Sequence, residues 1–356
     1  MKAVLVDGCI GEGGGQIVRS ALALAALTGR PAEISHIRAG RPKPGLRPQH
    51  LTAVRALAEI CAAECQGDLL NSQWLSFRPA NRPAGGDYRF DVSDAARGGS
   101  AGATTLVAQA ILLPLSFALQ PSRVRLHGGT HVPWSPPFHY LHDVFVPAAG
   151  RLGVRAAAAL QTWGWYPVGG GEFDLRVEPI KELSGREWIE RGELARVTGV
   201  AAVTNLPAHI PQRMADRARN VLGAAGIASH IQPLRARGPA AGAGIFLTAE
   251  YANGAAGFSA LGRKGRPAEK VAEEACERLL LYDRDEKVAA IGPYLADQLV
   301  LPLALAAGDS AFTTSRITEH TLTNIRVVRQ FLDTQIKVER HGDGGRIEIQ
   351  GIGYHV

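Results

Sequence analysis

The chain repeats one helical pattern three times. Three apolar segments begin at a glutamine and are typical of buried helices, at residues 16–25, 109–118 and 298–306. An amphipathic helix is expected after each of them, at residues 49–58, 138–152 and 320–332. Short segments typical of strands, such as residues 123–127 and 346–350, lie between and after these helices. Two helices backed by a few strands, built three times, predict an α/β sandwich of repeated units.

The third unit is interrupted by a long segment with secondary structure of its own. Between the glycine turn at residues 169–171 and the apolar segment at Gln298, the chain is far longer than one connection requires. Strands are expected here at residues 195–203 and 244–250, and helices at residues 210–223 and 267–280. We therefore expect a large domain of residues 1–183 and 285–356, and a smaller α/β domain inserted at residues 184–284.

Composition restricts the class of protein. The 356 residues, 46% of them hydrophobic, suffice for a sizeable core and for two or more domains. The net charge of +6 suits a polyanionic partner. The N-terminus has no signal-peptide core, and polar residues or prolines break the apolar runs before the ~20 residues that a membrane span needs. We expect a cytoplasmic protein with no membrane partner, and the sequence sets no oligomeric state.

A glycine-rich turn at residues 7–16 connects a short apolar run to the first helix. A strand, a glycine turn and a helix in this order bring backbone N–H groups to a phosphate. A Walker A loop would need a lysine after the glycines, and the dinucleotide fingerprint would need a glycine where Gln16 stands. Glu12 can hold a divalent cation that bridges to phosphate, or it can cap the helix. A plain tight turn is the other interpretation.

A cationic loop follows this turn. Arg38, Arg41, Lys43 and Arg47 fall within ten residues that contain no acidic side chain. Arginine binds phosphate oxygens through two parallel hydrogen bonds and stays charged at physiological pH. The first fifty residues therefore indicate a protein that holds phosphates, although the loop cations are also compatible with a basic surface.

Six ordered blocks of sequence resemble the RNA 3′-terminal phosphate cyclase family. They extend from the first expected strand to the last expected helix, at residues 11–17, 38–46, 49–52, 166–171, 294–298 and 320–325. The resemblance implies three copies of a unit with two helices and a four-stranded sheet, together with a small inserted α/β domain. This agrees with the fold class that the repeats predict.

The resemblance also implies a reaction in three steps. A histidine attacks the α-phosphorus of ATP, releases pyrophosphate and retains AMP on its imidazole. AMP then passes to the 3′-terminal phosphate of an RNA. The neighbouring 2′-hydroxyl attacks this activated phosphate, so that a 2′,3′-cyclic phosphate forms and AMP leaves. ATP and RNA with a 3′-terminal phosphate are the implied substrates, and the covalent intermediate divides one difficult dehydration into easier transfers.

The implied nucleophile is His320, at the start of the last block. Neutral imidazole is abundant near pH 7 and suits this role. From the residues alone, a histidine at a helix N-terminus that only bonds locally is the competing interpretation, since the chain has 11 histidines. His50 lies at a comparable place in the first unit, but in the block that the resemblance assigns to phosphate contacts.

The remaining implied site residues surround ATP. Glu12 and Asp297 would hold Mg²⁺ or Mn²⁺ beside the phosphates. The phosphates would be bound by Gln16, Arg19, Arg38, Arg41 and Gln49. Tyr294 and Pro136 would flank the adenine, and Gln109 and Gln298 would lie in the same nucleotide site. Without the resemblance, Asp297 and Gln298 are expected to start a helix and to cap it, and Arg19 to lie on a solvated helix face.

Two features depart from the family's common pattern or lie outside its blocks. His131 and Trp134 stand in residues 130–137, where small or polar residues are commoner in the family. The cations Arg235, Arg237 and those at residues 263–266 lie in the insert, where they either contact RNA or form solvated basic loops.

The sequence argues against three other classes of protein. A non-catalytic ribosome-assembly protein of the same superfamily would lack the histidine. An enolpyruvyl transferase would need another anion-binding set, and a P-loop ATPase would need its lysine.

Overall fold

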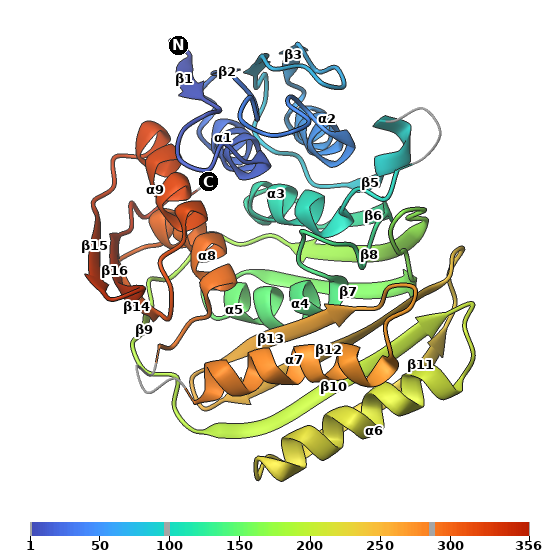
Figure 1. Ribbon diagram of the computed structural model, residues 1–356. Helices are drawn as coiled ribbons and strands as arrows, with labels where there is room; N and C mark the ends of the chain where they lie inside the picture. The colour runs from blue at the N-terminus through green and yellow to red at the C-terminus, as the bar shows by residue number, and fades with distance from the viewer. Residues whose placement is uncertain (1, 96–99, 285–288, 356) are drawn as a thin grey trace.

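The computed structural model describes residues 2–95, 100–284 and 289–355. Its described strands form four four-stranded sheets with helices packed against them, which confirms the predicted α/β class (Figure 1). None of the helices in these ranges is long and apolar enough to cross a membrane.

The first sheet contains β1 (Val4–Asp7), β2 (Ala32–Ser35), β3 (Glu64–Gln66) and β4 (Leu75–Arg78), in the order β1-β2-β4-β3. Its helices are α1 (Gly15–Thr28) and α2 (Pro48–Cys61), each within a residue of the expected start. β1 runs parallel to β2, and the other neighbours are antiparallel.

The second sheet has the same pattern, with the order β5-β6-β8-β7. Its strands are β5 (Asp87–Asp91), β6 (Ser122–Gly128), β7 (Arg155–Thr162) and β8 (Gly171–Glu178). The helices are η1 (Val92–Ala95), α3 (Thr104–Ser116), and a continuous helical segment made of α4 (Phe138–Tyr140), the π-helix η2 (Leu141–Phe145) and α5 (Val146–Gly150). α3 begins before Gln109, so the expectation that Gln109 starts this helix is wrong.

The third sheet joins the far end of the chain to one earlier strand. Its order is β15-β16-β14-β9, with β9 (Glu187–Trp188), β14 (Asp309–Thr314), β15 (Ile336–His341) and β16 (Gly344–Gln350). Its helices are α8 (Pro293–Leu305) and α9 (Glu319–Phe331). Again one pair, β9 and β14, is parallel and the others are antiparallel.

The residues expected in the insert form a sheet with a core of its own. The order is β11-β10-β12-β13, from β10 (Leu194–Thr204), β11 (Ser229–Ala236), β12 (Gly242–Tyr251) and β13 (Gly254–Leu261). α6 (His209–Ala224) and α7 (Ala268–Asp283) pack on one face and share a buried cluster with it that includes Met214, Ile245 and Leu279. Because β9 pairs with β14, we propose that the inserted domain begins after β9 rather than at residue 184.

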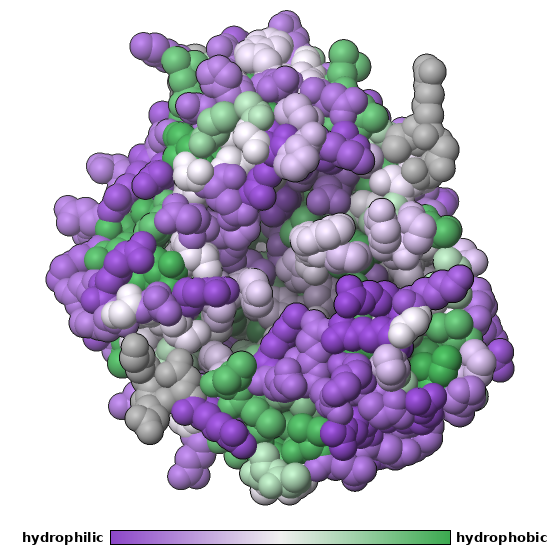
Figure 2. All heavy atoms as spheres, in the orientation of Figure 1, coloured by the Kyte–Doolittle hydropathy of each residue, from purple (hydrophilic) through white to green (hydrophobic). Residues whose placement is uncertain are grey.

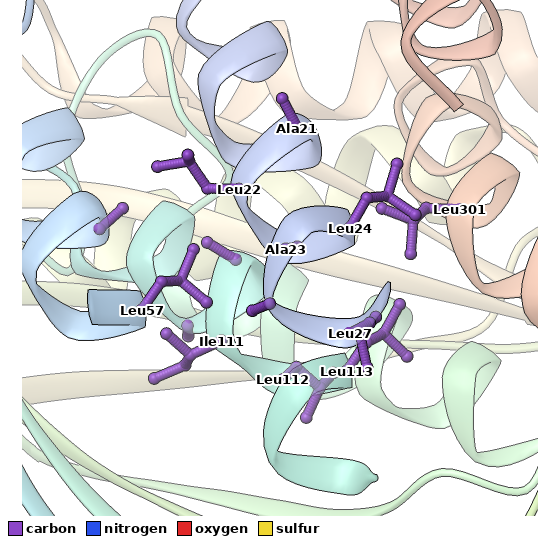
Figure 3. Close-up of a cluster of buried hydrophobic side chains, with 14 of the residues drawn as sticks. Ala21, Leu22, Ala23, Leu24, Leu27, Leu57, Ile111, Leu112, Leu113 and Leu301 are labelled. Carbon is purple, nitrogen blue, oxygen red and sulfur yellow. The ribbon is translucent and has the colours of Figure 1, made fainter. Parts of the chain in front are cut away.

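α1 is the central helix of the large core. Residues 21–27 of α1 are all buried, and its many alanines let neighbouring helices approach closely. Figure 3 shows this helix among side chains of α2, α3 and α8, with Leu22 and Leu24 of α1 near Leu57, Ile111 and Leu301. The packing fixes the N-terminus of α1, and with it the glycine turn, relative to three other helices.

This packing makes a stability prediction. Leu22 is fully buried, so Leu22→Ala should lower the free energy of unfolding by about 2–5 kcal/mol, because apolar burial is reduced and a cavity is left behind. Urea denaturation followed by circular dichroism measures the change. Leu119→Ala is the control, because Leu119 is 82% exposed and its truncation should leave the urea midpoint within error. Equal midpoints for Leu22→Ala and the wild type would contradict the central role of α1.

Candidate active site

The glycine turn lies where α1, α2 and α9 meet. Gly11 has φ +60°, and a Cβ there would fall 2.2 Å from the Thr323 Oγ1 on α9. A Cβ on Gly15 would fall 2.1 Å from the His50 Nε2 on α2. Glycine is required at both positions because the helices approach the backbone directly. Gly14, the N-cap of α1, offers no side-chain cap, so the N-terminal N–H groups of α1 are left to other partners.

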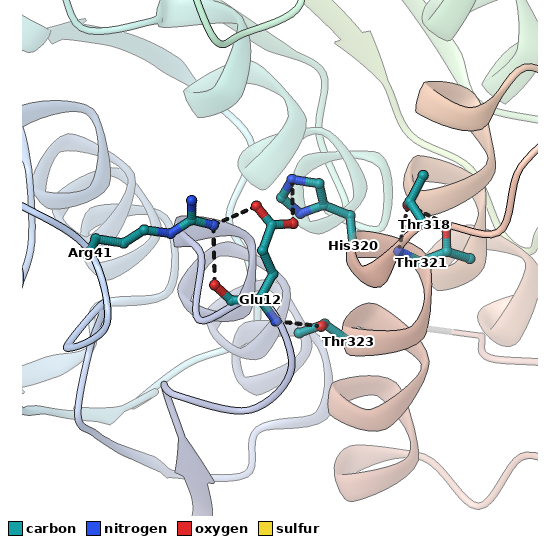
Figure 4. Close-up of polar contacts among 6 residues, drawn as sticks. All are labelled: Glu12, Arg41, Thr318, His320, Thr321 and Thr323. Atoms are coloured by element: carbon teal, nitrogen blue, oxygen red, sulfur yellow. Dashed lines mark hydrogen bonds and ion pairs between the residues drawn. The ribbon is translucent and has the colours of Figure 1, made fainter.

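Glu12 connects the two ends of the chain. Its carboxylate contacts the Arg41 guanidinium through Oε1 and the His320 Nε2 through Oε2, the latter at 2.8 Å (Figure 4). The Glu12 backbone N–H donates to Thr323 Oγ1 at 3.4 Å, and its carbonyl accepts from Arg41 at 3.1 Å. Glu12 therefore does not cap α1. Its side chain lies between a cation from the loop and a histidine from α9.

His320 does not cap α9. The N-cap of α9 is Thr318, whose hydroxyl accepts from the Thr321 N–H at 3.1 Å. The His320 side chain is 43% exposed, and burial lowers its pKa below the usual 6.5, as do the charges of Arg19 and Arg41, while Glu12 opposes this shift. The ring is therefore mostly neutral near pH 7.

His50, the competing histidine, has a structural role. It is buried, and its Nδ1 accepts the Arg47 backbone N–H at 3.1 Å in a reciprocal cap of α2. Its Nε2 faces the backbone of Gly15. Burial, followed by the charges of Arg19, Arg38 and Arg47, holds the pKa of His50 well below 6.5.

Asp297 and Arg19 form the buried side of the site. Burial raises the pKa of Asp297 to about 7, opposed by Arg19 and Gln16 and reinforced by Glu12. Burial also lowers the pKa of Arg19 to about 10, opposed by Asp297. Arg19 is half-buried and lies within electrostatic range of the Asp297 carboxylate, so it is not on a fully solvated helix face. α8 begins at Pro293 with Gly292 as N-cap, so the alternative that Asp297 and Gln298 start and cap this helix is wrong.

Several buried polar atoms near these residues lack partners. Asn324 of α9 donates from Nδ2 to the carbonyl of Asp297 on α8 at 2.7 Å. Within the described ranges, no hydrogen bond reaches Asp297 Oδ1, Gln298 Oε1, Asn324 Oδ1 or, on α3, Gln109 Nε2. Each unpaired buried group costs about 1–3 kcal/mol, so their accumulation is typical of a binding site.

The cationic loop is held in shape by its own backbone. Arg38 has φ +52° and donates from Nη1 to the carbonyls of Lys43 and Gly45, at 2.7 and 3.0 Å. Burial lowers the pKa of Arg38, and Arg47 and Arg41 add to this effect. Cations collected in this way attract an anion.

The remaining predicted residues lie on elements around this centre. Gln49 Oε1 accepts from Ala103, the N-cap of α3, at 3.0 Å. The carbonyl of Pro136 accepts from Thr105 Oγ1 at 2.7 Å. Tyr294 on α8 is 63% exposed. Burial raises the pKa of Tyr140 above 10, and the charges of Asp297 and Tyr294 contribute, which puts the segment after Pro136 beside α8.

Thr323 and Asn324 contact the site residues Glu12 and Asp297, a role that was not predicted from the sequence. Both follow His320 on α9 by three and four residues, a spacing that puts side chains on one helix face. That spacing was a usable signal, because two polar side chains beside a candidate nucleophile predict contacts with the elements facing it.

The carboxylates fit a divalent cation only in part. The described parts of the chain contain no cluster of three or more His, Cys, Asp or Glu side chains arranged for a metal. The unpaired Asp297 Oδ1 and the Glu12 carboxylate are hard oxygen donors, the type that Mg²⁺ and Mn²⁺ prefer. Such an ion would take its other ligands from phosphate oxygens and water.

The fold and the site together define an α/β protein in which cations and helix N-termini surround a histidine–carboxylate pair. The family model for RNA 3′-terminal phosphate cyclase matches residues 10–338. This chain belongs to the RNA 3′-terminal phosphate cyclase family, and as a member it is an enzyme.

Individual relatives agree over nearly the whole chain. Proteins named RNA 3′-terminal phosphate cyclase are 52% identical in Gloeothece citriformis, over 93% of this chain and 94% of theirs, and 51% identical in Methylococcus capsulatus, over 99% and 97%. The one from Salmonella agona is 42% identical over 95% and 94%. Among solved structures, the enolpyruvyl transferase NikO from Streptomyces tendae aligns with a TM-score of 0.38 and 13% identity, over 100% of this chain and 49% of that chain. That similarity is too low to support a conclusion.

The electrostatics of His320 can be measured directly. Its pKa should lie below 6.5 in the metal-free protein, and Glu12→Gln should lower it further because the opposing charge is removed. Arg41→Ala should raise it, since a repelling cation is removed. NMR titration of the ring Cε1–H, assigned with His320→Ala, gives the values. A higher pKa in Glu12→Gln would contradict this account.

Asp297 should make stability depend on pH. Its folded pKa of about 7 exceeds the usual 3.8, so its contribution is fully present below pH 4 and disappears as the pH rises through 7. In the presence of a chelator, Asp297→Asn should therefore gain stability relative to wild type between pH 5 and pH 8, by roughly 1–3 kcal/mol. Urea unfolding at the two pH values measures this. A difference independent of pH would mean that the Asp297 carboxyl titrates normally.

Proposed function

We propose that this protein uses ATP to convert an RNA 3′-terminal phosphate into a 2′,3′-cyclic phosphate through a covalent adduct of His320 with AMP. The observation that carries the proposal is the contact of His320 Nε2 with Glu12, at 2.8 Å, at the N-terminal end of α1 and beside the cationic loop. Family membership supplies the overall reaction, and the site suggests how this chain performs it.

His320 acts as the nucleophile. Attack requires a neutral ring, which the lowered pKa favours, and a lone pair on the nitrogen that faces the phosphates. In the contact with Glu12, Nε2 carries a proton and donates it to the carboxylate. Attack through Nε2 therefore requires this proton to leave and the remaining ring proton to reside on Nδ1. Attack of Nε2 on the α-phosphorus forms an N–P bond and breaks the bond to the bridging oxygen, so that pyrophosphate leaves.

The anionic charge of ATP is matched by nearby cations and N–H groups. Arg19, Arg38 and Arg41 supply charge, and Gln16 and the uncapped N–H groups of α1 supply directional donors. Gln49, bonded to the N-cap of α3, lies within the same set. These groups hold the triphosphate so that its α-phosphorus faces His320, which makes the attack effectively unimolecular.

Glu12 and Asp297 would hold Mg²⁺ or Mn²⁺. The ion would neutralise charge on the departing pyrophosphate. The unpaired Asp297 Oδ1 and its raised pKa support this role, because a bound cation would stabilise the carboxylate that burial disfavours. Tyr294 and Pro136 would flank the adenine, with Gln109 and Gln298 supplying unpaired amide groups to the nucleotide.

The second half of the reaction consumes the adduct. An oxygen of the RNA 3′-phosphate attacks the phosphorus of the adduct, so the N–P bond breaks and His320 is regenerated. The RNA 2′-hydroxyl then loses its proton and attacks the 3′-phosphorus. The cyclic phosphodiester forms, and AMP leaves with the electrons of the broken P–O bond.

Incubation with Mg²⁺ and α-labelled ATP tests this proposal. The wild-type protein should acquire an acid-labile label, and His320→Ala should acquire roughly a hundredfold less or none, since removing a covalent nucleophile abolishes the step. His341→Ala is a matched control, because His341 is an exposed histidine on β15, and it should label normally. Glu12→Gln should label more slowly than wild type.

Two outcomes would contradict the proposal. An unlabelled wild-type protein would exclude the adduct. Undiminished label on His320→Ala would place the nucleophile elsewhere.

A further inference from the structure

Two exposed aromatic side chains lie close to the candidate nucleotide site. Trp134 is 92% exposed and Tyr166 is 61% exposed. Trp134 also has φ +60°, a left-handed conformation that is costly for a bulky residue and that persists where the surroundings enforce it. Exposed aromatic rings on a fixed backbone are the platforms on which proteins stack unpaired bases.

The backbone beneath these rings is tightly held. The Thr130 and His131 N–H groups both donate to the Gly164 carbonyl at 3.0 Å, and the Gly169 N–H donates to the Trp165 carbonyl at 2.7 Å. Below them, His131 stacks on Trp163 with ring centroids 4.1 Å apart. The segments that carry Trp134 and Tyr166 are thus neighbours that pack on the same buried aromatic residues. The fixed backbone keeps both side chains exposed.

Two basic segments of the insert, at the end of β11 and after β13, lie near the same residues 163–165. The Trp163 N–H donates to the carbonyl of Arg237 at 3.1 Å, so the end of β11 lies against it. At the start of β12, a Cβ on Gly242 would fall 2.1 Å from the Trp165 ring. The Ala243 carbonyl accepts from the Gly262 N–H at 2.8 Å, which brings in the loop of residues 263–264.

The cations at the end of β11 and in the loop after β13 have no ion-pair partner in the described part of the chain. Arg235, Arg237, Arg263 and Lys264 are exposed, and none forms an ion pair with a residue in the described ranges. In contrast, several arginines on the helices of the insert are paired with carboxylates, as Arg213 is with Glu269 at 2.7 Å. Unpaired cations can bind the phosphates of a single-stranded nucleic acid, and neighbouring exposed aromatic rings can stack on its bases.

We propose that Trp134, Tyr166, Arg237, Arg263 and Lys264 form an aromatic–basic surface that binds the unpaired nucleotides preceding the RNA 3′-phosphate. The proposal rests on the function proposed above. Pro136, two residues after Trp134, is bonded to α3, and η2 a few residues further on contacts α8, the helix of Asp297, so this surface is continuous with the candidate site. Figure 2 shows a face of the molecule that is hollowed near its centre, with many hydrophilic side chains around the hollow.

Equilibrium binding tests the aromatic part of this surface. The probe is a fluorescein-labelled, unstructured RNA of about ten nucleotides with a 3′-phosphate, in the His320→Ala background without ATP, so that no adduct forms. Trp134→Ala and Tyr166→Ala should each weaken binding by about 5- to 100-fold, the range expected when one base stack is removed. Leu119→Ala should bind as the parent, because Leu119 is similarly exposed but lies beyond the other end of α3.

Salt dependence tests the basic part. The double variant Arg237→Ala/Arg263→Ala should reduce the slope of log K against log[salt] by about 0.7 for each RNA phosphate that is no longer neutralised. Arg340→Ala is the matched control, because Arg340 is an exposed arginine on β15 without an ion pair in the described ranges, and it should leave the slope unchanged. A dinucleotide with a 3′-phosphate should be less sensitive to the aromatic and basic substitutions than the longer RNA, because it can contact less of the surface.

Labelling with ATP separates this inference from the proposed function. With His320 intact, Trp134→Ala and Tyr166→Ala should acquire the AMP label at the wild-type rate. If the wild type labels but the variants bind RNA normally, the surface serves another partner, such as a protein, and the inference is overturned. If Trp134→Ala instead labels poorly and binds RNA normally, Trp134 belongs to the nucleotide site, which also overturns it. An unlabelled wild type refutes the function alone.

Discussion

The direct contact of the glycine turn with α2 and α9 is the constraint on which the rest of the site depends. Gly11 lies against Thr323, and Gly15 lies against His50, at separations that exclude any side chain. These contacts bring Glu12 between Arg41 and His320, although about 300 residues separate Glu12 from His320 in the sequence. Because residues 21–27 of α1 are buried among other helices, the turn cannot shift without disturbing the core of the large domain.

A consequence of this arrangement is that the site is electrostatically costly without a ligand. Asp297 and Arg19 are both buried enough for their pKa values to move toward the neutral form, and polar atoms of Gln298 and Asn324 are left without partners in the described part of the chain. Such groups lower stability unless a ligand satisfies them. These positions therefore lower the stability of the ligand-free protein. An anionic ligand and a cation would satisfy the unpaired groups and restore that stability.

The sequence predicted the helices of the first unit and of the insert within a few residues, because periodicity and glycine or proline boundaries act locally. The starts of α3 and α8 differ from the prediction because the residues before Gln109 and Gln298, which are less strongly apolar, also adopt helical structure. The pairing of Glu12 with Arg41 and the bond from Asn324 to Asp297 depend on tertiary packing. No local pattern encodes them, and only the resemblance brought Glu12 and Asp297 together.

The insert's position follows from a buried aromatic cluster rather than from its own core. Phe246 of β12 stacks on His139 with centroids 4.8 Å apart, and His131 bonds to His139 at 3.0 Å. Burial lowers the pKa of His139 to about 4, so this pair is uncharged near neutral pH and can pack as an apolar group. The same cluster supports the backbone under Trp134 and Tyr166. The residues that attach the insert therefore also fix the distance between its basic loops and the candidate site, which is what a surface that guides an RNA end to His320 requires.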